Sequence, residues 1–545
     1  MNTSGLLIAQ LFSIRNRYGK NFSTQKLILL TALESEPVKG KKALQLYHGI
    51  LLFLIAYPDN KAVYWQANCS LQQLQLYIQS HETIKESLYN SGITNTKLCA
   101  AFSFEIVKWL RGKHPKDIHI SSFEGNEIQI RSILSVVMPK VESEILQDAN
   151  ATWRSWLKRS MKRGEDMLDR FIAVFNETDI RPETRDELWN AIGINVEINL
   201  PSHHALPPSL IIPYYHPSLI KKNFKKQVVK PTLVQLDETE AGYIIECSRM
   251  ILVRHLREID PITFTAPALV SYCNLPRGLS IALMAMVTER RHPIDSYMGY
   301  VVFKNGLPVA YGGSWILFNS GRIGLNVFPA YRGGESQYIF QQVLQLHSRV
   351  YKLKRFSVDP YQLGKENSDG INSGSFWVYY HAGFRPIKKE QQQLAEAEAL
   401  KIISTKGYRS PGKVLEKLAD VRLELLLQKN AVRFDATDVS IAYSNILKTQ
   451  YNNNRKLAEE RAFTKLATLL QIKNYHEEKM QFVLKNWCVL LLCNEQELQH
   501  NKGLQKKLKK LITLKANGAE EDYIAELQQA KEMRKLLERI VKDVG

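Results

Sequence analysis

A short segment carries the residue types best suited to binding phosphate groups. It reads VFPAYRGGES and contains Arg332, Gly333 and Gly334 between a predicted strand and a predicted helix. The glycines lack side chains, so backbone N–H groups approach a ligand closely there. The N–H groups that open the helix point at the same place, and the helix dipole favours negative charge. Arg332 adds a permanent charge with a planar fork that suits phosphate oxygens. The segment predicts a pyrophosphate cradle, with an ordinary tight turn as the alternative.

The elements that must hold this cradle can be read on either side of it. Three short strands, SYMGYVVF, LPVAYGGSWILF and RIGLNVF, are predicted as an antiparallel meander, and Asn305-Gly306 between the first two is a strong hairpin signal. After the cradle, one helix face carries Ile339, Val343, Leu346 and Val350. RFSVDP then reads as a buried strand, and a short aromatic helix ending at Gly383 precedes a final strand.

This order of elements, together with one spaced motif, resembles the GNAT acyltransferase superfamily. Members have a central meander, an acyl-CoA pyrophosphate loop that opens a helix, and a later helix ending in Tyr-x-x-x-Gly-Phe. The family pattern is Asn, a small residue at plus three, Tyr at plus seven and Gly-Phe at plus eleven and plus twelve. The chain matches it with Asn372, Ser375, Tyr379 and Gly383-Phe384.

The resemblance implies a role for each matched position. Asn372 would contact the CoA arm, and Tyr379 would be the general acid that protonates the departing CoA thiolate. The thioester carbonyl and the pantetheine would be held by the backbone of Asn326, Val327 and Phe328. The pyrophosphate would be bound by Arg332, Gly333, Gly334 and Ser336.

The loop departs from the family pattern, which is Gln or Arg, two residues, Gly, one residue, then Gly or Ala. Tyr331, Gly334 and Ser336 have that spacing, with Tyr in the first place. The alternative pairs Arg332 and Gly333 with the usual Arg-Gly and deletes one residue. Because the loop is degenerate, a fold of this type that has lost its cofactor is a competing interpretation.

Two acidic residues are candidates for the general base that an amine acceptor needs. Glu335 lies at the start of the predicted helix, where the helix dipole favours acidic residues in any case. Asp359 follows the strand RFSVDP. The other site residues also have structural interpretations: Tyr379 belongs to an aromatic helix typical of a core, and Asn372 is a good helix cap.

Composition sets the class of protein. The chain has 545 residues, of which 45% are hydrophobic and 23% charged, as in soluble proteins with several domains. The net charge of +19 allows nucleic acid, anionic lipid or an acidic cofactor as partner. Six cysteines without a Cys-x-x-Cys pair argue against a disulfide framework, so we expect a reducing, cytoplasmic compartment. The apolar run from Ala43 to Tyr57 is shorter than the ~20 residues that span a bilayer, so we expect no membrane span.

Four parts are predicted along the chain. Residues 1–200 read as a mainly helical domain, 201–230 as a Pro-rich linker, 231–388 as the GNAT-like domain and 389–545 as a charged helical domain. The expected fold class is α+β, a GNAT-like mixed sheet with flanking helices between two mainly α-helical regions. Within the core, RGLSIALMAMVTER is predicted as a helix. The linker histidines, which are His203, His204 and His216, are interpreted as loop residues without a metal.

Two basic segments stand out in the flanking regions. TWRSWLKRSMKRGEDMLDRFIAVF is predicted as one amphipathic helix with a basic face, and a second cluster comprises Lys506, Lys507, Lys509 and Lys510. Such segments are typical of solvated helix faces. Docking to nucleic acid or another acidic macromolecule is the alternative.

The sequence therefore predicts an enzyme that moves an acyl group, such as acetyl, from a CoA thioester to an amine by direct attack. The expected partners are acyl-CoA, an amine acceptor that the sequence does not name, and an acidic macromolecule on the basic faces. No metal is implied. Two other functions stay open: a non-catalytic binding or scaffold protein, and an aminoacyl-tRNA-dependent transferase, which the positive charge would suit.

Overall fold

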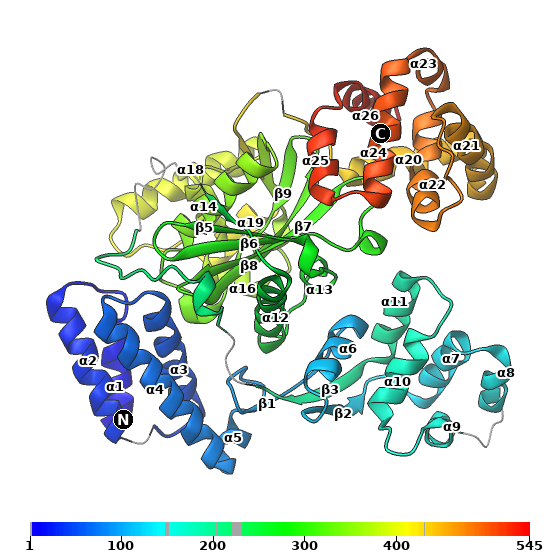
Figure 1. Cartoon of the computed structure of the whole chain (residues 1–545). Helices are drawn as coiled ribbons and strands as arrows, with labels where there is room; N and C mark the ends of the chain where they lie inside the picture. Colours follow the sequence, from blue (N-terminus) through cyan, green and yellow to red (C-terminus); the bar gives the residue numbers. More distant parts are fainter. Residues whose placement is uncertain are drawn as a thin grey trace. The chain divides into compact units, whose positions relative to one another are not determined.

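The structure is a computed structural model and describes residues 3–36, 38–147, 152–201, 205–220, 231–429 and 431–544. The chain is a mixed α+β protein that divides into two compact units (Figure 1). Unit 1 comprises Met1–Pro207, Tyr214–Ser218 and Glu246–Glu258, and unit 2 comprises Pro208–Pro213, Leu219–Ile245 and Ile259–Gly545. The described residues of the predicted linker are shared between the units. His203 and His204 lie outside the described residues, and His216 is buried in unit 1.

Unit 1 begins with helices and continues as a small α+β part. The first helices are α1 (Thr3–Ile14), α2 (Lys20–Ser35), α3 (Lys41–Ala56), α4 (Lys61–Ser80) and α5 (Glu82–Ser87). An antiparallel sheet follows in the order β1-β3-β2, made of β1 (Lys97–Ala101), β2 (Ile118–Phe123) and β3 (Ile194–Asn199). Its helices are α6 (Phe104–Lys113), α7 (Glu127–Val137), α8 (Lys140–Ser143), α9 (Trp153–Ser160), α10 (Met167–Asn176) and α11 (Pro182–Ile192).

The prediction of a single basic helix over residues 152–175 is wrong. Helix α9 ends at Ser160, and α10 begins only at Met167. Asp166 starts the second helix through a reciprocal cap, in which its side chain accepts from the Asp169 N–H and the Asp169 side chain accepts in return. Gly164 has φ +87°, which a continuous helix does not allow.

Unit 2 is built on one long sheet with the strand order β12-β13-β11-β9-β8-β7-β6-β5-β4, and β10 pairs with β8 beside β9. Pairing is antiparallel except between β9 and β11, which are parallel. The strands are β4 (Thr232–Val234), β5 (Val270–Leu275), β6 (Leu279–Met284), β7 (Ser296–Lys304), β8 (Leu307–Leu317), β9 (Ser320–Ile323), β10 (Asn326–Val327), β11 (Arg355–Val358), β12 (Arg385–Pro386) and β13 (Leu423–Leu426).

The meander predicted around Asn305-Gly306 is present as β7, β8 and β9 with β10. Both turn residues have positive φ, +46° and +82°, as the tight hairpin turn requires. The helices that accompany the sheet are α12 (Glu238–Arg254, shared with unit 1), α13 (Asp260–Thr263), α14 (Ser336–Val350), α15 (Pro360–Leu363), α16 (Ser368–Ser373), α17 (Ser375–His381), α18 (Lys389–Ser404) and α19 (Gly412–Ala419).

Two predictions about the limits of the sheet are wrong. RGLSIALMAMVTER contains strand β6, not a helix, and all six residues of that strand are buried. A boundary at residue 388 also cuts the sheet, because β13 comes from the region predicted to be wholly helical. Strand β13 pairs antiparallel with both β11 and β12, so it lies between them.

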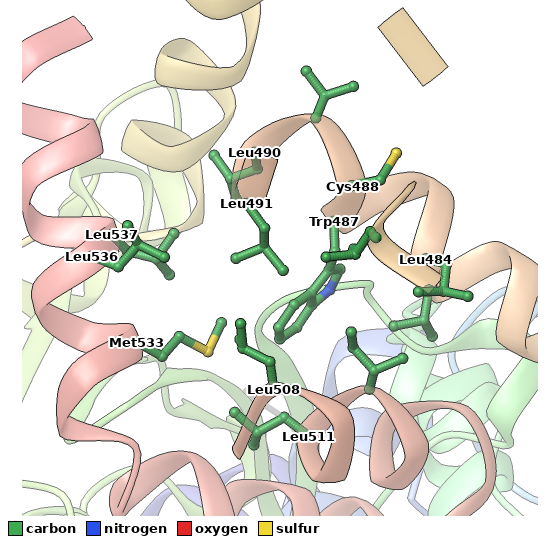
Figure 2. Packing of buried hydrophobic residues seen from close by; sticks show 14 of the residues in the cluster. Leu484, Trp487, Cys488, Leu490, Leu491, Leu508, Leu511, Met533, Leu536 and Leu537 are labelled. Atoms are coloured by element: carbon green, nitrogen blue, oxygen red, sulfur yellow. The ribbon is translucent and has the colours of Figure 1, made fainter. Parts of the chain in front are cut away.

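The remaining helices form a hydrophobic cluster in unit 2 that also includes Leu317 and Phe318 at the end of β8. They are α20 (Ala436–Tyr451), α21 (Arg455–Leu469), α22 (Glu478–Leu492), α23 (Glu495–His500), α24 (Lys502–Asn517), α25 (Glu520–Gln528) and α26 (Lys531–Val544). Figure 2 shows Trp487 of α22 among leucines of α22, α24 and α26, with Met533 beside them. The Trp487 indole donates to the Pro293 carbonyl at 2.8 Å, and Lys515 Nζ donates to that of Asp295 at 2.8 Å. These bonds fix the helices to the segment that precedes β7.

Within the part of the chain that the structure describes, no helix combines the length and apolar character needed to cross a bilayer. The apolar run from Ala43 to Tyr57 coincides with helix α3, whose residues from Ile50 to Ala56 are all buried.

Candidate functional site

The centre of the sheet contains a strand that loses its neighbour halfway along. Strands β9 and β10 keep a single register against β8, from Leu317↔Ser320 to Ala310↔Val327. Strand β11 covers the other edge only as far as the pair Ser357↔Arg322. Beyond Arg322 this edge is no longer paired with β11. The unpaired strand edge from Ile323 to Val327 is called the opening here.

Tyr379 of α17 reaches this opening. The Leu325 N–H donates to the Tyr379 hydroxyl at 3.1 Å, which shows that this backbone group points away from β8. The Phe328 N–H donates to the Val309 carbonyl at 3.1 Å on the β8 side. Backbone groups alternate along an antiparallel strand, so the Val327 N–H points to the same edge as that of Leu325. The structure thus places the Tyr379 hydroxyl beside the backbone of Leu325, one residue before the segment Asn326–Phe328 that the resemblance assigns to the thioester.

The environment of Tyr379 keeps its proton in place. The side chain is 2% exposed, and its ring packs edge-on against Phe340 of α14 and Phe384. Burial raises the pKa of Tyr379 to about 12, against a smaller opposing effect of the Leu325 N–H. The hydroxyl is therefore protonated at neutral pH and retains its own hydrogen for donation.

Two further side chains lie against Gly324, and sequence reasoning missed both. Tyr300 of β7 donates to the Gly324 carbonyl, one residue before Leu325. Gln362 of α15 packs over Gly324, where an added Cβ would lie 2.8 Å from the Gln362 Cδ. The available signal was a glycine inside RIGLNVF, which the sequence predicted as one strand, because such a glycine marks a close approach by another group. Gln362 thus packs against the strand at Gly324, one residue before Leu325.

The phosphate-binding segment follows β10 directly. Gly333 has φ +87°, a conformation that favours glycine, and Arg332 and Gly333 are exposed. The first helical hydrogen bond of α14 runs from Ile339 N to Glu335 O at 2.9 Å, and the Glu335 side chain does not cap the helix. The first N–H groups of a helix have no carbonyl partner within it, which leaves Ser336 at a helix start that attracts anions.

The Arg332 guanidinium is engaged with another part of the site. It forms a forked ion pair with Asp369 of α16, with Nη2 at 2.9 Å from Oδ2 and Nη1 at 3.3 Å from Oδ1. Asn372 lies one turn further along α16 and is exposed. Residues three apart share a helix face, so Asn372 lies on the same side as the Arg332–Asp369 pair. Asn372 lies inside α16, and the residue at the N-cap position of α17 is Gly374. The alternative interpretation of Asn372 as the cap of the aromatic helix is therefore wrong.

Glu335 has a different role from the general base that the sequence suggested. Its side chain is fully buried, and Lys304 Nζ lies 2.7 Å from its Oε2. Arg277 and the Ile220 N–H bind its Oε1, at 2.5 Å from Arg277 Nη2 and 2.9 Å from the amide. Burial alone would raise the pKa of Glu335, but Lys304 and Arg277 hold it below its ordinary value. A carboxylate with both oxygens bound by cations is poorly suited to accept a substrate proton.

Asp359 also forms ion pairs. Its Oδ2 lies 3.3 Å from Arg322 Nε, and its Oδ1 lies 3.5 Å from Arg422 Nε. Ser375, the small residue of the motif, donates to the Gln362 carbonyl at 2.8 Å and so links α17 to α15. The arrangement supplies a protonated hydroxyl, backbone N–H groups that point away from β8, and a helix start that attracts anions. Neither of the two predicted bases, Glu335 and Asp359, has a carboxylate without a cationic partner.

In comparisons with known proteins, no protein-family model, curated protein or solved structure matches the chain. The site is therefore interpreted from its own geometry. Within the described residues, no group of three or more His, Cys, Asp or Glu side chains is arranged to hold a metal ion.

Proposed function

We propose that unit 2 is an acyltransferase that moves an acyl group from a CoA thioester to an amine. The observation that carries the proposal is the bond from the Leu325 N–H to the Tyr379 hydroxyl, at the point where the strand leaves β11. It brings a protonated hydroxyl beside outward backbone N–H groups, which are the two groups that thioester aminolysis requires.

Each part of the site has a task in this proposal. The Val327 N–H polarises the thioester carbonyl and stabilises the oxyanion that forms on attack. Arg332, Gly333, Gly334 and the first N–H groups of α14 hold the pyrophosphate, and Asn372 contacts the CoA arm. Asp369 competes with the pyrophosphate for Arg332, so binding requires the exchange of one exposed ion pair for contacts to phosphate.

The bond changes in this reaction balance without a metal or redox partner. The amine nitrogen attacks the carbonyl carbon, an N–C bond forms and the C–S bond breaks. Tyr379 gives its proton to the departing thiolate, and the proton that the amine loses restores the tyrosine.

A second candidate function is a binding protein on the same fold, and the ion pairs of the loop favour it. Arg332 already has a carboxylate partner, and Glu335 is fully engaged in the interior. Calorimetric titration of the full chain with acetyl-CoA and longer acyl-CoAs distinguishes the two. We expect micromolar to millimolar binding for the transferase, and no heat of binding at millimolar acyl-CoA would reject it in favour of the binding protein.

A further inference from the structure

Unit 1 presents a group of exposed positive charges on α9 and the loop that follows it. Helix α9 buries Trp153, Trp156 and Leu157 and turns its other residues outward. The exposed cations, called the basic surface here, are Arg154, Lys158, Arg159, Lys162 and Arg163. The helix is therefore amphipathic, with an apolar inner side and a cationic outer side.

The charges of the basic surface are not neutralised by nearby carboxylates. Within the described residues, no carboxylate lies within 4.0 Å of the charged groups of Lys158, Arg159, Lys162 or Arg163, while Arg154 has only Glu127 at 3.6 Å. The aspartates that follow in the sequence bind a different cation. Asp166, which caps α10, and Asp169 in its first turn each have a carboxylate oxygen 2.7 Å from Arg111 Nη2.

Two hydrogen bonds restrain the loop that carries Lys162 and Arg163. The Lys162 N–H donates to Glu165 Oε2 at 2.7 Å, and Arg170 Nε donates to Ser160 Oγ at 3.1 Å. The Arg170 bond joins α10 to the end of α9, and the Lys162 bond lies within the loop between them. These bonds restrain the backbone that carries the basic surface, which lowers the entropy cost of binding.

The spacing of the charges suits a partner with regularly placed negative groups. Arg154 and Lys158 are four residues apart and so share one side of α9, about 6 Å apart along the axis. Trp153 is 0% and Trp156 7% exposed, so neither ring offers a face on which an unpaired base could stack. We propose that the basic surface binds the phosphate backbone of double-stranded nucleic acid.

The second basic cluster of the chain has a different environment and provides a matched control. Lys507 and Lys510 both bind Glu526, Lys510 at 2.6 Å, and Lys509 Nζ donates to the Gln471 carbonyl at 2.6 Å. Three of its four lysines are therefore bound within the chain. Equal numbers of charges can be removed from the two clusters, and only one removal should reduce binding to nucleic acid.

The test measures binding of the full chain to a fluorescent duplex of about 30 base pairs, as DNA and as RNA, between about 50 and 200 mM salt. With four phosphates contacted, log K should fall with log salt at a slope of about −3.6, a loss of about 150-fold across this range. The variant Lys158→Gln/Arg159→Gln/Lys162→Gln/Arg163→Gln should lose most of this affinity and most of the slope. The variant Lys506→Gln/Lys507→Gln/Lys509→Gln/Lys510→Gln should retain both. Thermal unfolding of each variant establishes that it is folded.

Four results would overturn the proposal. They are no duplex binding at about 50 mM salt, the same loss in both variants, tighter binding to single strands than to duplexes, and tighter binding to polyglutamate or to anionic vesicles. The DNA and RNA arms identify which duplex supplies the phosphates. No acyl-CoA enters the assay, so its result does not depend on the function proposed for unit 2.

Discussion

The ammonium group of Lys304 lies 2.7 Å from Glu335 Oε2, and neither side chain is exposed to solvent. Lys304 ends β7, while the second cation, Arg277, lies in the turn between β5 and β6. The two hairpin ends are themselves joined, because Asn305 N donates to the Gly278 carbonyl at 2.8 Å. Glu335 directly follows Gly334, so its carboxylate ties the proposed phosphate-binding loop to two hairpins of the sheet.

The first prediction concerns the loss of that carboxylate charge. Glu335→Gln keeps the shape but leaves Lys304 and Arg277 without their anion, and uncompensated buried charge costs about 3–5 kcal/mol. We expect the free energy of unfolding in urea to fall by this amount. Adding Lys304→Met should restore part of the loss, because it removes a buried cation. A loss below about 1 kcal/mol in the single variant would contradict this account.

The second prediction follows from the direction of the Glu335 pKa shift. The pKa is below its ordinary value of 4.5 in the folded chain, so the carboxylate stabilises the fold above that pH. The contribution is lost as pH falls through the folded-state pKa. The difference in stability between the natural chain and Glu335→Gln should therefore shrink below about pH 4.5. Urea unfolding of both proteins between about pH 6 and 3 measures this difference in the free energy of unfolding. A difference that stays constant or widens as the pH falls would contradict a lowered pKa of Glu335.

The third prediction tests Tyr379 as the general acid. Tyr379→Phe keeps the ring among Phe340 and Phe384 and removes only the hydroxyl, so stability should fall by about 0.5–1.5 kcal/mol. Turnover of acyl-CoA against a panel of amines should fall ~10²–10⁴-fold, with acyl-CoA affinity near that of the natural chain.

Tyr380→Phe is the matched control for this change. Tyr380 lies on the same helix, half-buried, with its ring against Phe376 and Arg385. We expect its variant to retain turnover. Equal turnover in folded Tyr379→Phe and Tyr380→Phe would assign Tyr379 to the core.

The fourth prediction separates Arg332 from its partner. Arg332→Ala should weaken acyl-CoA binding about tenfold to a hundredfold, because charge-assisted contacts to phosphate contribute ~1.5–3 kcal/mol. Asp369→Asn instead releases the guanidinium, so affinity should stay equal or rise. Both side chains are largely exposed, so stability should change by no more than about 1 kcal/mol in either variant. Titration calorimetry measures the acyl-CoA affinities. An equal loss of affinity in both variants would mean that the Arg332–Asp369 ion pair maintains the shape of the loop.

The fifth prediction concerns Gly312, over which the Tyr300 ring passes. A Cβ at this position would lie 2.6 Å from the Tyr300 Cζ and closer still to the Gly324 carbonyl. Gly312→Ala should therefore destabilise unit 2 by at least about 1–3 kcal/mol. Gly242 in α12 has open space around an added Cβ, so Gly242→Ala should stabilise by about 0.5–1 kcal/mol. Thermal unfolding compares the two, and a neutral Gly312→Ala would show that Tyr300 adapts freely.

The local patterns in the sequence were sufficient for the elements around the opening. Asn305-Gly306 predicted a hairpin, and Gly383, with φ +106°, lies just beyond the end of α17 as expected. The apolar spacing in 339–350 predicted α14, although Val350 at its end is 38% exposed. These signals are strong because turn geometry and helix periodicity depend on neighbours within a few residues.

What the sequence could not supply was the environment created by distant segments. Strand β6 was read as a helix because a strand buried on both faces has no alternation to reveal it. Glu335 was read as a base or a cap because its partners, Lys304 and Arg277, come from other hairpins. The same holds for Gln362, which lies over Gly324 only once β10 and α15 have come together.

The position of β13 has a consequence for the order in which the chain can fold as it is synthesised. Strand β11 ends at Val358, 68 residues before β13 ends at Leu426, and β12 pairs with β13 at the edge of the sheet order. Until Leu423–Leu426 has left the ribosome, the outer edge of β11 presents unpaired backbone groups, and such edges invite pairing with other chains. A nascent chain that ends near residue 388 should therefore need protection by a chaperone, whereas one that extends past Leu426 can close its own sheet.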